Sequence, residues 1–186
     1  MINLPAIYVP KEYPHVTENE AEAIWFAAKN PRFRLFIKVL WFTGLRINEA
    51  LSLRVKNLEH NRFEFTLNVV RLKKRSLKSE RLPISRELGT DLYDYIQATP
   101  FKPNDLIFPG HENTYRYQVK VCAQRAGLPN WKEIHPHSFR HGFVYHKVKA
   151  NVHPFVLSKL VGHSNLSNTL RYYQPTENDL RQAMES

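Results

Sequence analysis

The chain has 186 residues with 27 lysines and arginines against 17 aspartates and glutamates, a formal net charge of +10. This length suits one domain with its own core, and an apolar fraction of 42% excludes a disordered chain. The single cysteine, Cys122, excludes an internal disulfide and a Cys-rich zinc module. The sequence contains neither an apolar run near the ~20 residues that span a bilayer nor a signal-peptide pattern at its start. We therefore expect a cytoplasmic globular domain without membrane contacts.

The positive charge is concentrated in two blocks. Residues 31–90 carry 14 basic and 5 acidic side chains, and residues 131–175 carry 6 and 1. If the fold brings both blocks to one face, that face attracts a polyanion, so we expect nucleic acid as the partner. The alternative is a solvated loop that serves solubility. The densest run has six cations within eleven residues: Arg71, Lys73, Lys74, Arg75, Lys78 and Arg81.

The first elements predicted along the chain are helices. Thr17 with Glu20 three residues later has the pattern of a capping box, which predicts a helix to about Asn30. Pro31 can start the next helix, whose apolar residues recur at helical spacing. Gly44 interrupts this pattern before a short third helix.

The pattern then changes to alternation. Residues 62–70 alternate apolar and polar side chains and predict a strand, and residues 81–84 predict a second one. The basic cluster between them is expected to form the hairpin tip. Together these patterns indicate an α+β fold that is mainly helical, in a single domain with one small antiparallel sheet. Further helices are predicted over residues 86–98, 114–126, 138–150, 154–162 and 176–185.

Three segments carry residue types suited to phosphate chemistry. The first is Thr-Gly-Leu-Arg-Ile-Asn-Glu-Ala-Leu-Ser-Leu, in which Arg46 follows a glycine turn. The second is His-Ser-Phe-Arg-His, in which His137 and Arg140 are three residues apart and share a helix face. The third is Leu-Val-Gly-His, in which His163 is followed nine residues later by Tyr172. Each segment alone is a weak signal.

In this order and spacing, the three segments closely resemble the signatures of the tyrosine recombinase (phage integrase) family, and the resemblance covers roughly residues 17–175. It implies a catalytic domain of that type and a site-specific DNA recombinase. Such an enzyme cleaves and rejoins strands through a 3′-phosphotyrosyl intermediate, in integration, excision or inversion. The resemblance further implies double-stranded DNA as substrate, a tetramer of this chain on DNA, and no cofactor. It also implies that the protein serves a mobile genetic element, comes from a phage or a prokaryote, and is associated with the nucleoid.

The resemblance also implies a role for individual residues. A hairpin lysine serves as general acid; counting forward from Arg46 favours Lys73, which we prefer, and counting back from Pro83 favours Lys74. Tyr173 is out of register by one residue. The catalytic residues expected from the resemblance are Arg46, Lys73, His137, Arg140, His163 and Tyr172. The expected DNA contacts are Lys74, Arg75, Lys78, Arg81 and His141.

The reaction explains why these residue types are needed. Two arginines can hold the non-bridging oxygens of a phosphodiester and stabilise the charge of the transition state. The tyrosine hydroxyl has a pKa of ~10 in solution, so it needs positive charge or a base such as His137 before it attacks. The lysine can protonate the leaving 5′ oxygen, and His163 can donate a hydrogen bond to the phosphate.

Three other interpretations fit parts of the sequence. His137 and His141 have the spacing of a helical metal pair, but no glutamate follows the first histidine and Arg140 would lie beside the metal, so we expect none. A DNA-binding accessory protein without activity is opposed by the full set of catalytic residue types. A type IB topoisomerase uses a similar set, but the spacing from His163 to Tyr172 and the short tail favour the recombinase.

We divide the chain into an N-terminal extension over residues 1–16, the catalytic domain over residues 17–175 and a C-terminal tail helix over residues 176–186. Family members usually carry a separate N-terminal helical domain, for which sixteen residues are too few. The chain is therefore either an excised catalytic domain or a short recombinase that consists of the catalytic domain. In the tail, Leu180 and Met184 form a small apolar stripe, which either docks in a neighbouring copy or caps its own domain.

Overall fold

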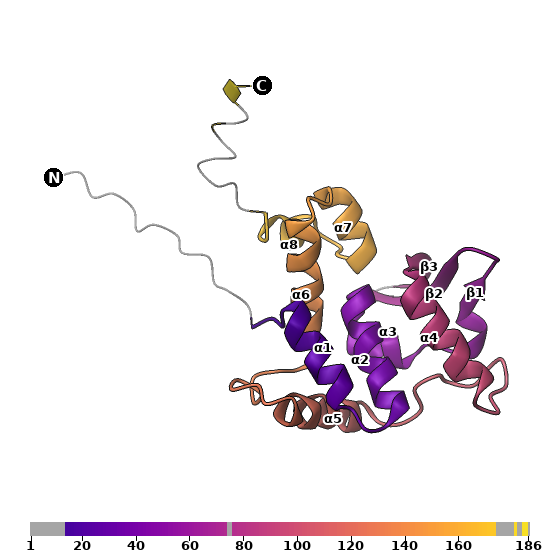
Figure 1. Ribbon diagram of the computed structural model, residues 1–186. Coiled ribbons are helices and arrows are strands. Elements are labelled where there is room, and N and C mark those ends of the chain that lie inside the picture. Colours follow the sequence, from indigo (N-terminus) through magenta and orange to yellow (C-terminus); the bar gives the residue numbers. More distant parts are fainter. Residues whose placement is uncertain (1–13, 74–75, 174–180, 182–183, 186) are drawn as a thin grey trace.

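The computed structural model describes residues 14–73, 76–173, 181 and 184–185, with backbone only for residues 72, 73 and 76–78. Most of the helices lie to one side of a small sheet at one end of the molecule (Figure 1). In chain order the elements are α1 (Glu18–Ala27), α2 (Pro31–Thr43), α3 (Ile47–Leu51), the 3-10 helix η1 (Val55–Asn57), β1 (Leu58–His60), β2 (Phe65–Lys73), β3 (Ser76–Ile84), α4 (Arg86–Gln97), α5 (Glu112–Arg125), α6 (Pro136–Lys149), α7 (Pro154–Val161) and α8 (Ser167–Leu170).

The first two helices begin where the Thr17–Glu20 pair and Pro31 predict. The Thr17 side chain accepts a hydrogen bond from the Glu20 amide at 3.3 Å, and the Thr17 amide donates to the Glu20 carboxylate at 2.7 Å. Asn30 caps α2, and Pro31 occupies the first turn, where no amide donor is needed. Gly44 ends α2 with a φ of 61°, in the left-handed region that favours glycine. The predicted break between the second and third helices is therefore confirmed.

The strand predicted over residues 62–70 is shifted by three residues, to β2, and the strand predicted over residues 81–84 begins five residues earlier, as β3. The strands form an antiparallel sheet in the order β1-β2-β3, and the pairing of β2 with β3 continues to Lys73 opposite Ser76. The expectation that the whole basic cluster forms a hairpin tip is wrong, because Arg71 and Lys78 are paired strand residues. The edge strand β1 has three residues, too few for alternation to identify it.

Helix α2 lies at the centre of the core and packs against α1, α6, α4 and α5. In Figure 1, α2 and α3 lie between α6 and the sheet, and α4 packs against the central strand β2. A separate small cluster, built from Phe143, Val144, Leu157 and Val161, joins α6 to α7. The side chains of Tyr172 and Tyr173 pack against this small cluster. Its packing therefore holds the C-terminal part of the described chain on α6.

The segment before α1 is attached to α6 at a glycine. The Val16 amide donates to the Ser138 carbonyl at 3.3 Å, and Val16 is fully buried. A Cβ on Gly142 would lie 2.2 Å from the Val16 carbonyl oxygen, so this approach requires glycine. Within the described residues, none of the helices combines the length and the apolar character needed to cross a bilayer.

Candidate active site

Arg46 lies at the start of α3 and is held by a buried carboxylate. Its guanidinium donates to Glu49 Oε1 at 3.0 Å, and its amide donates to Glu49 Oε2 at 2.9 Å. The Glu49 side chain has no exposed surface, whereas the Arg46 side chain is 37% exposed. Arg46 is thus anchored on its buried side while part of its guanidinium stays accessible to a ligand.

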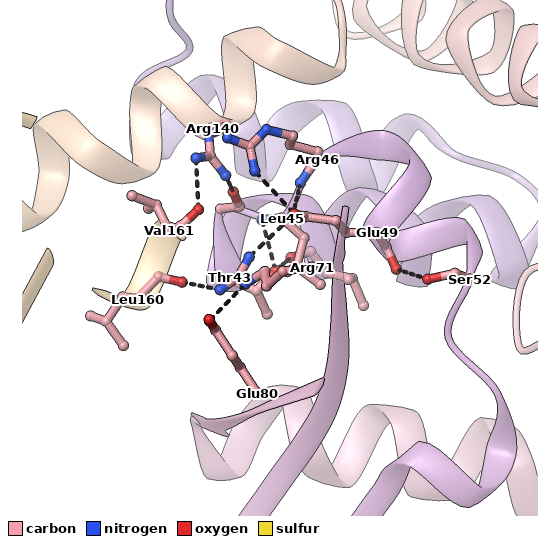
Figure 2. A network of polar contacts seen from close by, with 12 residues as sticks. Thr43, Leu45, Arg46, Glu49, Ser52, Arg71, Glu80, Arg140, Leu160 and Val161 are labelled. Atoms are coloured by element: carbon pink, nitrogen blue, oxygen red, sulfur yellow. Dashed lines mark hydrogen bonds and ion pairs between the residues drawn. The ribbon is translucent and has the colours of Figure 1, made fainter. Parts of the chain in front are cut away.

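Arg140 projects from α6 and joins two helix ends. Its two terminal nitrogens each donate at 2.7 Å, one to the Gly44 carbonyl after α2 and the other to the Val161 carbonyl at the end of α7. Burial, and next the positive charge of Arg46, lower the pKa of Arg140 to about 9, which leaves it charged at pH 7. Figure 2 shows Arg140 and Arg46 above the Leu45 backbone. The two cations form one positively charged site.

His163 follows the glycine that ends α7. Gly162 has a φ of 65°, and this left-handed turn directs the chain away from the helix. The His163 Nδ1 and the hydroxyl of the buried Thr169 are 2.8 Å apart. Burial, with Arg140 and Arg46 as further causes, lowers the pKa of His163 to about 4, so the ring is neutral at pH 7. When Thr169 donates to Nδ1, the ring proton is on Nε2, which can then donate to an anion.

Tyr172 follows α8 and contacts the second histidine of the His-Ser-Phe-Arg-His segment. Its hydroxyl is 2.5 Å from Nδ1 of His141. The Tyr145 ring packs edge-on against Tyr172, with 5.0 Å between the ring centroids. Burial, followed by the histidine and arginine neighbours His137 and Arg140, lowers the pKa of His141 to about 4. A neutral imidazole thus lies at hydrogen-bond distance from the tyrosine hydroxyl.

Tyr173 lies in a different environment from Tyr172. Its hydroxyl donates to the backbone carbonyl of Val152, in the connection between α6 and α7. Burial raises the pKa of this hydroxyl. Of the two adjacent tyrosines, Tyr172 is the one that the structure brings to the site histidines.

His137 occupies the first turn of α6, one helical turn before His141. The centroids of these two rings are 6.5 Å apart. Burial, and then the charge of Arg140, lower the pKa of His137. The sequence suggested His137 as a base for Tyr172, but the ring nitrogen at hydrogen-bond distance from the tyrosine hydroxyl is Nδ1 of His141. His141, expected among the DNA contacts, thereby lies next to the candidate nucleophile.

The hairpin residues are described only in part. Lys73 is the last residue of β2, two positions beyond Arg71, and its backbone pairs with Ser76. Lys74 and Arg75 lie outside the described residues, and for Lys78 the backbone alone is described. Arg81 is 73% exposed and forms an ion pair with Glu59 at 3.0 Å.

Arg71 is a site residue that sequence reasoning missed. We counted it among the surface cations, but its side chain is only 2% exposed. It contacts Glu49, Glu80 and the Leu160 carbonyl (Figure 2). The strand alternation contained a signal, because positions 67, 69 and 71 all face the same buried side of β2.

A groove lies beside the site. It has a volume of about 560 Å³, runs between α5 and the start of α6, and contains His137. Its other lining side chains are polar, basic and aromatic: Asn113, Arg116, Tyr117, Lys120 and His135.

Across the described ranges, no group of three or more histidine, cysteine, aspartate or glutamate side chains is arranged to hold a metal ion.

Comparisons with known proteins give a consistent result. The model of the phage integrase family matches residues 14–179. A tyrosine recombinase of Pseudothermotoga lettingae is 32% identical over 174 residues, which cover 91% of this chain and 56% of the relative. Tyrosine recombinase XerA of Pyrococcus horikoshii is 30% identical, over 95% of this chain and 62% of the relative. The chain therefore spans roughly three fifths of the length of these curated relatives.

Solved structures share the fold. The XerH site-specific recombinase bound to its difH substrate superposes with a TM-score of 0.76 at 23% identity, covering 96% of this chain and 56% of that one. The catalytic domain of bacteriophage HP1 integrase gives a TM-score of 0.65 at 23% identity, covering 94% of this chain and 95% of that one. The predicted fold class, mainly helical with a small antiparallel sheet, is confirmed.

Proposed function

This chain belongs to the phage integrase family, and we propose that it is a site-specific DNA recombinase that cleaves and rejoins strands through Tyr172. The observation that carries the proposal is the 2.5 Å contact between the Tyr172 hydroxyl and His141, the residue next to the buried Arg140. Helix α6 thus carries a neutral base and a cation for the phosphate at consecutive positions, and the nucleophile packs against this base.

The arginines bind the scissile phosphate in this proposal. Arg46 offers the exposed part of its guanidinium, and the buried Arg140 adds positive charge beside it. Charge-assisted hydrogen bonds of this kind stabilise the additional negative charge that develops on the non-bridging oxygens. His163 donates from Nε2 to the same phosphate. The family's requirement for two arginines and a histidine is then met by residues from three different helix ends.

Proton transfer accompanies each bond change. The Tyr172 hydroxyl gives its proton to Nδ1 of His141 as the phenolic oxygen attacks phosphorus. The bond from phosphorus to the 5′ oxygen breaks, and Lys73 protonates that oxygen. The product is a 3′-phosphotyrosyl bond and a free 5′ hydroxyl. A 5′ hydroxyl of another strand reverses these steps, so religation needs no external energy source.

We prefer Lys73 to Lys74 for the general acid. Lys73 stands two positions after Arg71 on β2, and alternate positions of a strand belong to the same face. Arg71 belongs to the face that meets Glu49 and the end of α7. This register supports the forward count from Arg46.

Double-stranded DNA is the proposed substrate, and its binding surface extends beyond the catalytic residues. The groove beside His137 contains the cations Arg116 and Lys120 and the 63% exposed Tyr117. We propose that this groove and the hairpin residues Lys74, Arg75, Lys78 and Arg81 contact the DNA backbone on either side of the scissile phosphate. We further propose that the protein works at the nucleoid, in recombination of a mobile element.

Assembly on DNA completes the proposal. We propose that four copies act together and that the tail over residues 176–186 contacts a neighbouring copy. Most of this tail lies outside the described residues; Met184, which is described, is 87% exposed. A stripe of two apolar side chains buries little area, so association is expected on DNA and a monomer in its absence.

The experiment that tests the function uses a library of nicked duplexes with randomised arms as suicide substrates. The nick lets a short cleaved fragment diffuse away, so a covalent protein–DNA adduct accumulates and survives denaturation in SDS. We expect adducts whose DNA, when sequenced, converges on a common target. Retarded mobility without any SDS-resistant adduct would instead indicate the DNA-binding accessory protein. Relaxation of supercoiled DNA without a preferred sequence would indicate the topoisomerase.

A further inference from the structure

Arg71 is a buried cation that connects three elements. It projects from β2 and is 2% exposed. Its guanidinium donates first to Glu49 of α3 at 3.1 Å, second to the Leu160 carbonyl of α7, and third to Glu80 of β3 at 3.3 Å. A guanidinium has five N–H donors in a fixed plane, so it can satisfy acceptors from three directions at once.

The first of these contacts leads to the phosphate-binding arginine. Glu49 accepts from the Arg46 guanidinium through Oε1 and from Arg71 through Oε2. Because the Glu49 side chain has no exposed surface, its orientation is fixed by these two cations. Arg71 therefore helps to determine where Arg46 is held.

The second contact leads to the other arginine and to His163. Leu160 and Val161 are consecutive residues, and their carbonyls accept from Arg71 and Arg140 respectively. A Cβ on Gly162 would lie 2.9 Å from Nε of Arg71, so the turn before His163 rests directly on this guanidinium. The end of α7 is thus held by two buried arginines.

The third contact joins β2 to β3 within the hairpin. Glu80 belongs to β3, and its backbone pairs with Val69 on β2. The salt bridge from Arg71 to Glu80 lies within the sheet, while the other Arg71 contacts leave it. In this way the strand that ends at Lys73 is tied to both sides of the arginine site.

We propose that Arg71 is a positioning residue that holds the β2–β3 hairpin, and with it the lysine general acid, in register with the phosphate-binding arginines. Arg71 acts through its contacts and does not itself touch the phosphate. The inference rests on the proposed function, since it assigns the hairpin lysine a role in strand cleavage. A buried ion pair is weak evidence for stability, because well-packed apolar residues can be equally stable. A buried arginine at position 71 is better explained by its role in fixing the relative positions of α3, α7 and the hairpin.

The test compares two DNA substrates that differ at one atom. In the second substrate, sulfur replaces the bridging 5′ oxygen of the scissile phosphate. A thiolate leaves without being protonated, so cleavage of this substrate does not need the lysine. The variants are Arg71→Met and Arg71→Lys, and the matched control is Arg62→Met, which removes an exposed arginine just before β2. Lysine keeps the charge but cannot reach three acceptors as the planar guanidinium does.

We expect Arg71→Met to slow cleavage of the oxygen substrate by about a hundredfold, the scale of lost general acid catalysis. Cleavage of the sulfur substrate should fall by a much smaller factor, which reports only the weaker hold on Arg46 and on the end of α7, and DNA affinity should change little. Arg71→Lys should lie between, and Arg62→Met should match wild type. An equal loss on both substrates, or no loss on either at a temperature where the variant is folded, would overturn the proposal. Failure of the wild-type protein to cleave either substrate would refute the proposed function instead.

A second measurement does not depend on cleavage. Hydrogen exchange in Arg71→Met should accelerate at residues 79–84 and at residues 160–163, the segments that Arg71 holds. Protection in α1 and α5 should remain as in wild type. A uniform acceleration over all helices would show general destabilisation and would contradict a local positioning role.

Discussion

The hydroxyl of Tyr172 lies 2.5 Å from Nδ1 of His141, so the segment that follows α8 is joined to the helix that carries Arg140. The imidazole is neutral at pH 7, because burial lowers its pKa to about 4. A neutral imidazole can accept the phenolic proton, whereas a protonated one would only donate. This pair defines the candidate nucleophile and its base.

Replacing His141 should slow the attack of Tyr172. We expect His141→Ala to lower the rate of adduct formation at pH 7 by about 10²-fold, the lower end of the range for loss of a general base, because a pKa of about 4 makes this imidazole a weak base. The rate should recover as pH rises toward 10, because tyrosine then ionises without help. Single-turnover rates between pH 6 and 10 measure this recovery.

The matched variant is His137→Ala, one helical turn away. It should keep the wild-type pH dependence, even if its rate falls through weaker contact with the phosphate. Recovery at high pH in the His137 variant and not in the His141 variant would reverse the assignment of the base.

Acid should destabilise the free protein over a defined window. His141 and His163 have pKa values of about 4 when folded, below the ordinary value of 6.5. Between these values the unfolded chain binds more protons, so the stability from neutral histidines is complete above pH 6.5 and is lost as pH falls toward 4. The midpoint of thermal unfolding should therefore decrease between pH 7 and pH 4. The double variant His141→Gln, His163→Gln should show a shallower decrease; an unaltered slope would contradict this origin.

Removing charge from the hairpin should change how DNA binding depends on salt. Each phosphate contact contributes about 0.9 to the slope of log affinity against log salt, so Arg75→Ala with Lys78→Ala should reduce the slope by about 2. The control is Lys29→Ala with Lys102→Ala, which removes equal charge outside the two basic blocks. Fluorescence anisotropy over a salt series gives both slopes. Equal slopes for the hairpin variant and wild type would mean that these side chains do not reach phosphate.

Deletion of residues 176–186 should separate DNA binding from assembly. Under the proposed role of the tail, binding to a duplex with one site persists, and assembly on a duplex with two sites fails. Native gels with the two duplexes, together with adduct formation on each, measure the two properties. Intact assembly by the shortened chain would show that the contact between copies lies elsewhere.

The sequence was most informative where local chemistry decides structure. The capping box of Thr17 and Glu20 predicted the start of α1, Pro31 predicted the start of α2, and Gly44 predicted the break after α2. The motifs predicted which segments converge, since Arg140 joins the end of α2 to the end of α7. These features depend on neighbours in the chain or on signatures strong enough to identify the family.

The features that were missed depend on contacts between distant segments. Arg71 has the composition of a surface cation, and only its partners Glu49 and Leu160, 22 and 89 residues away in sequence, explain its burial. The contact of His141 with Tyr172 requires the packing of α7 on α6 and of α8 on α7. The four-residue α8 and three-residue β1 are too short for periodicity to reveal.

The central claim is that Tyr172 is the residue that becomes linked to DNA. The most direct measurement compares SDS-resistant adducts formed by wild type, Tyr172→Phe and Tyr173→Phe on the same nicked duplex. Tyr172→Phe removes the hydroxyl beside His141, and Tyr173→Phe removes a hydroxyl bonded to the Val152 carbonyl. We expect no adduct from Tyr172→Phe and an adduct from Tyr173→Phe, with DNA affinity retained in both. An adduct from Tyr172→Phe, together with its loss in Tyr173→Phe, would contradict the account.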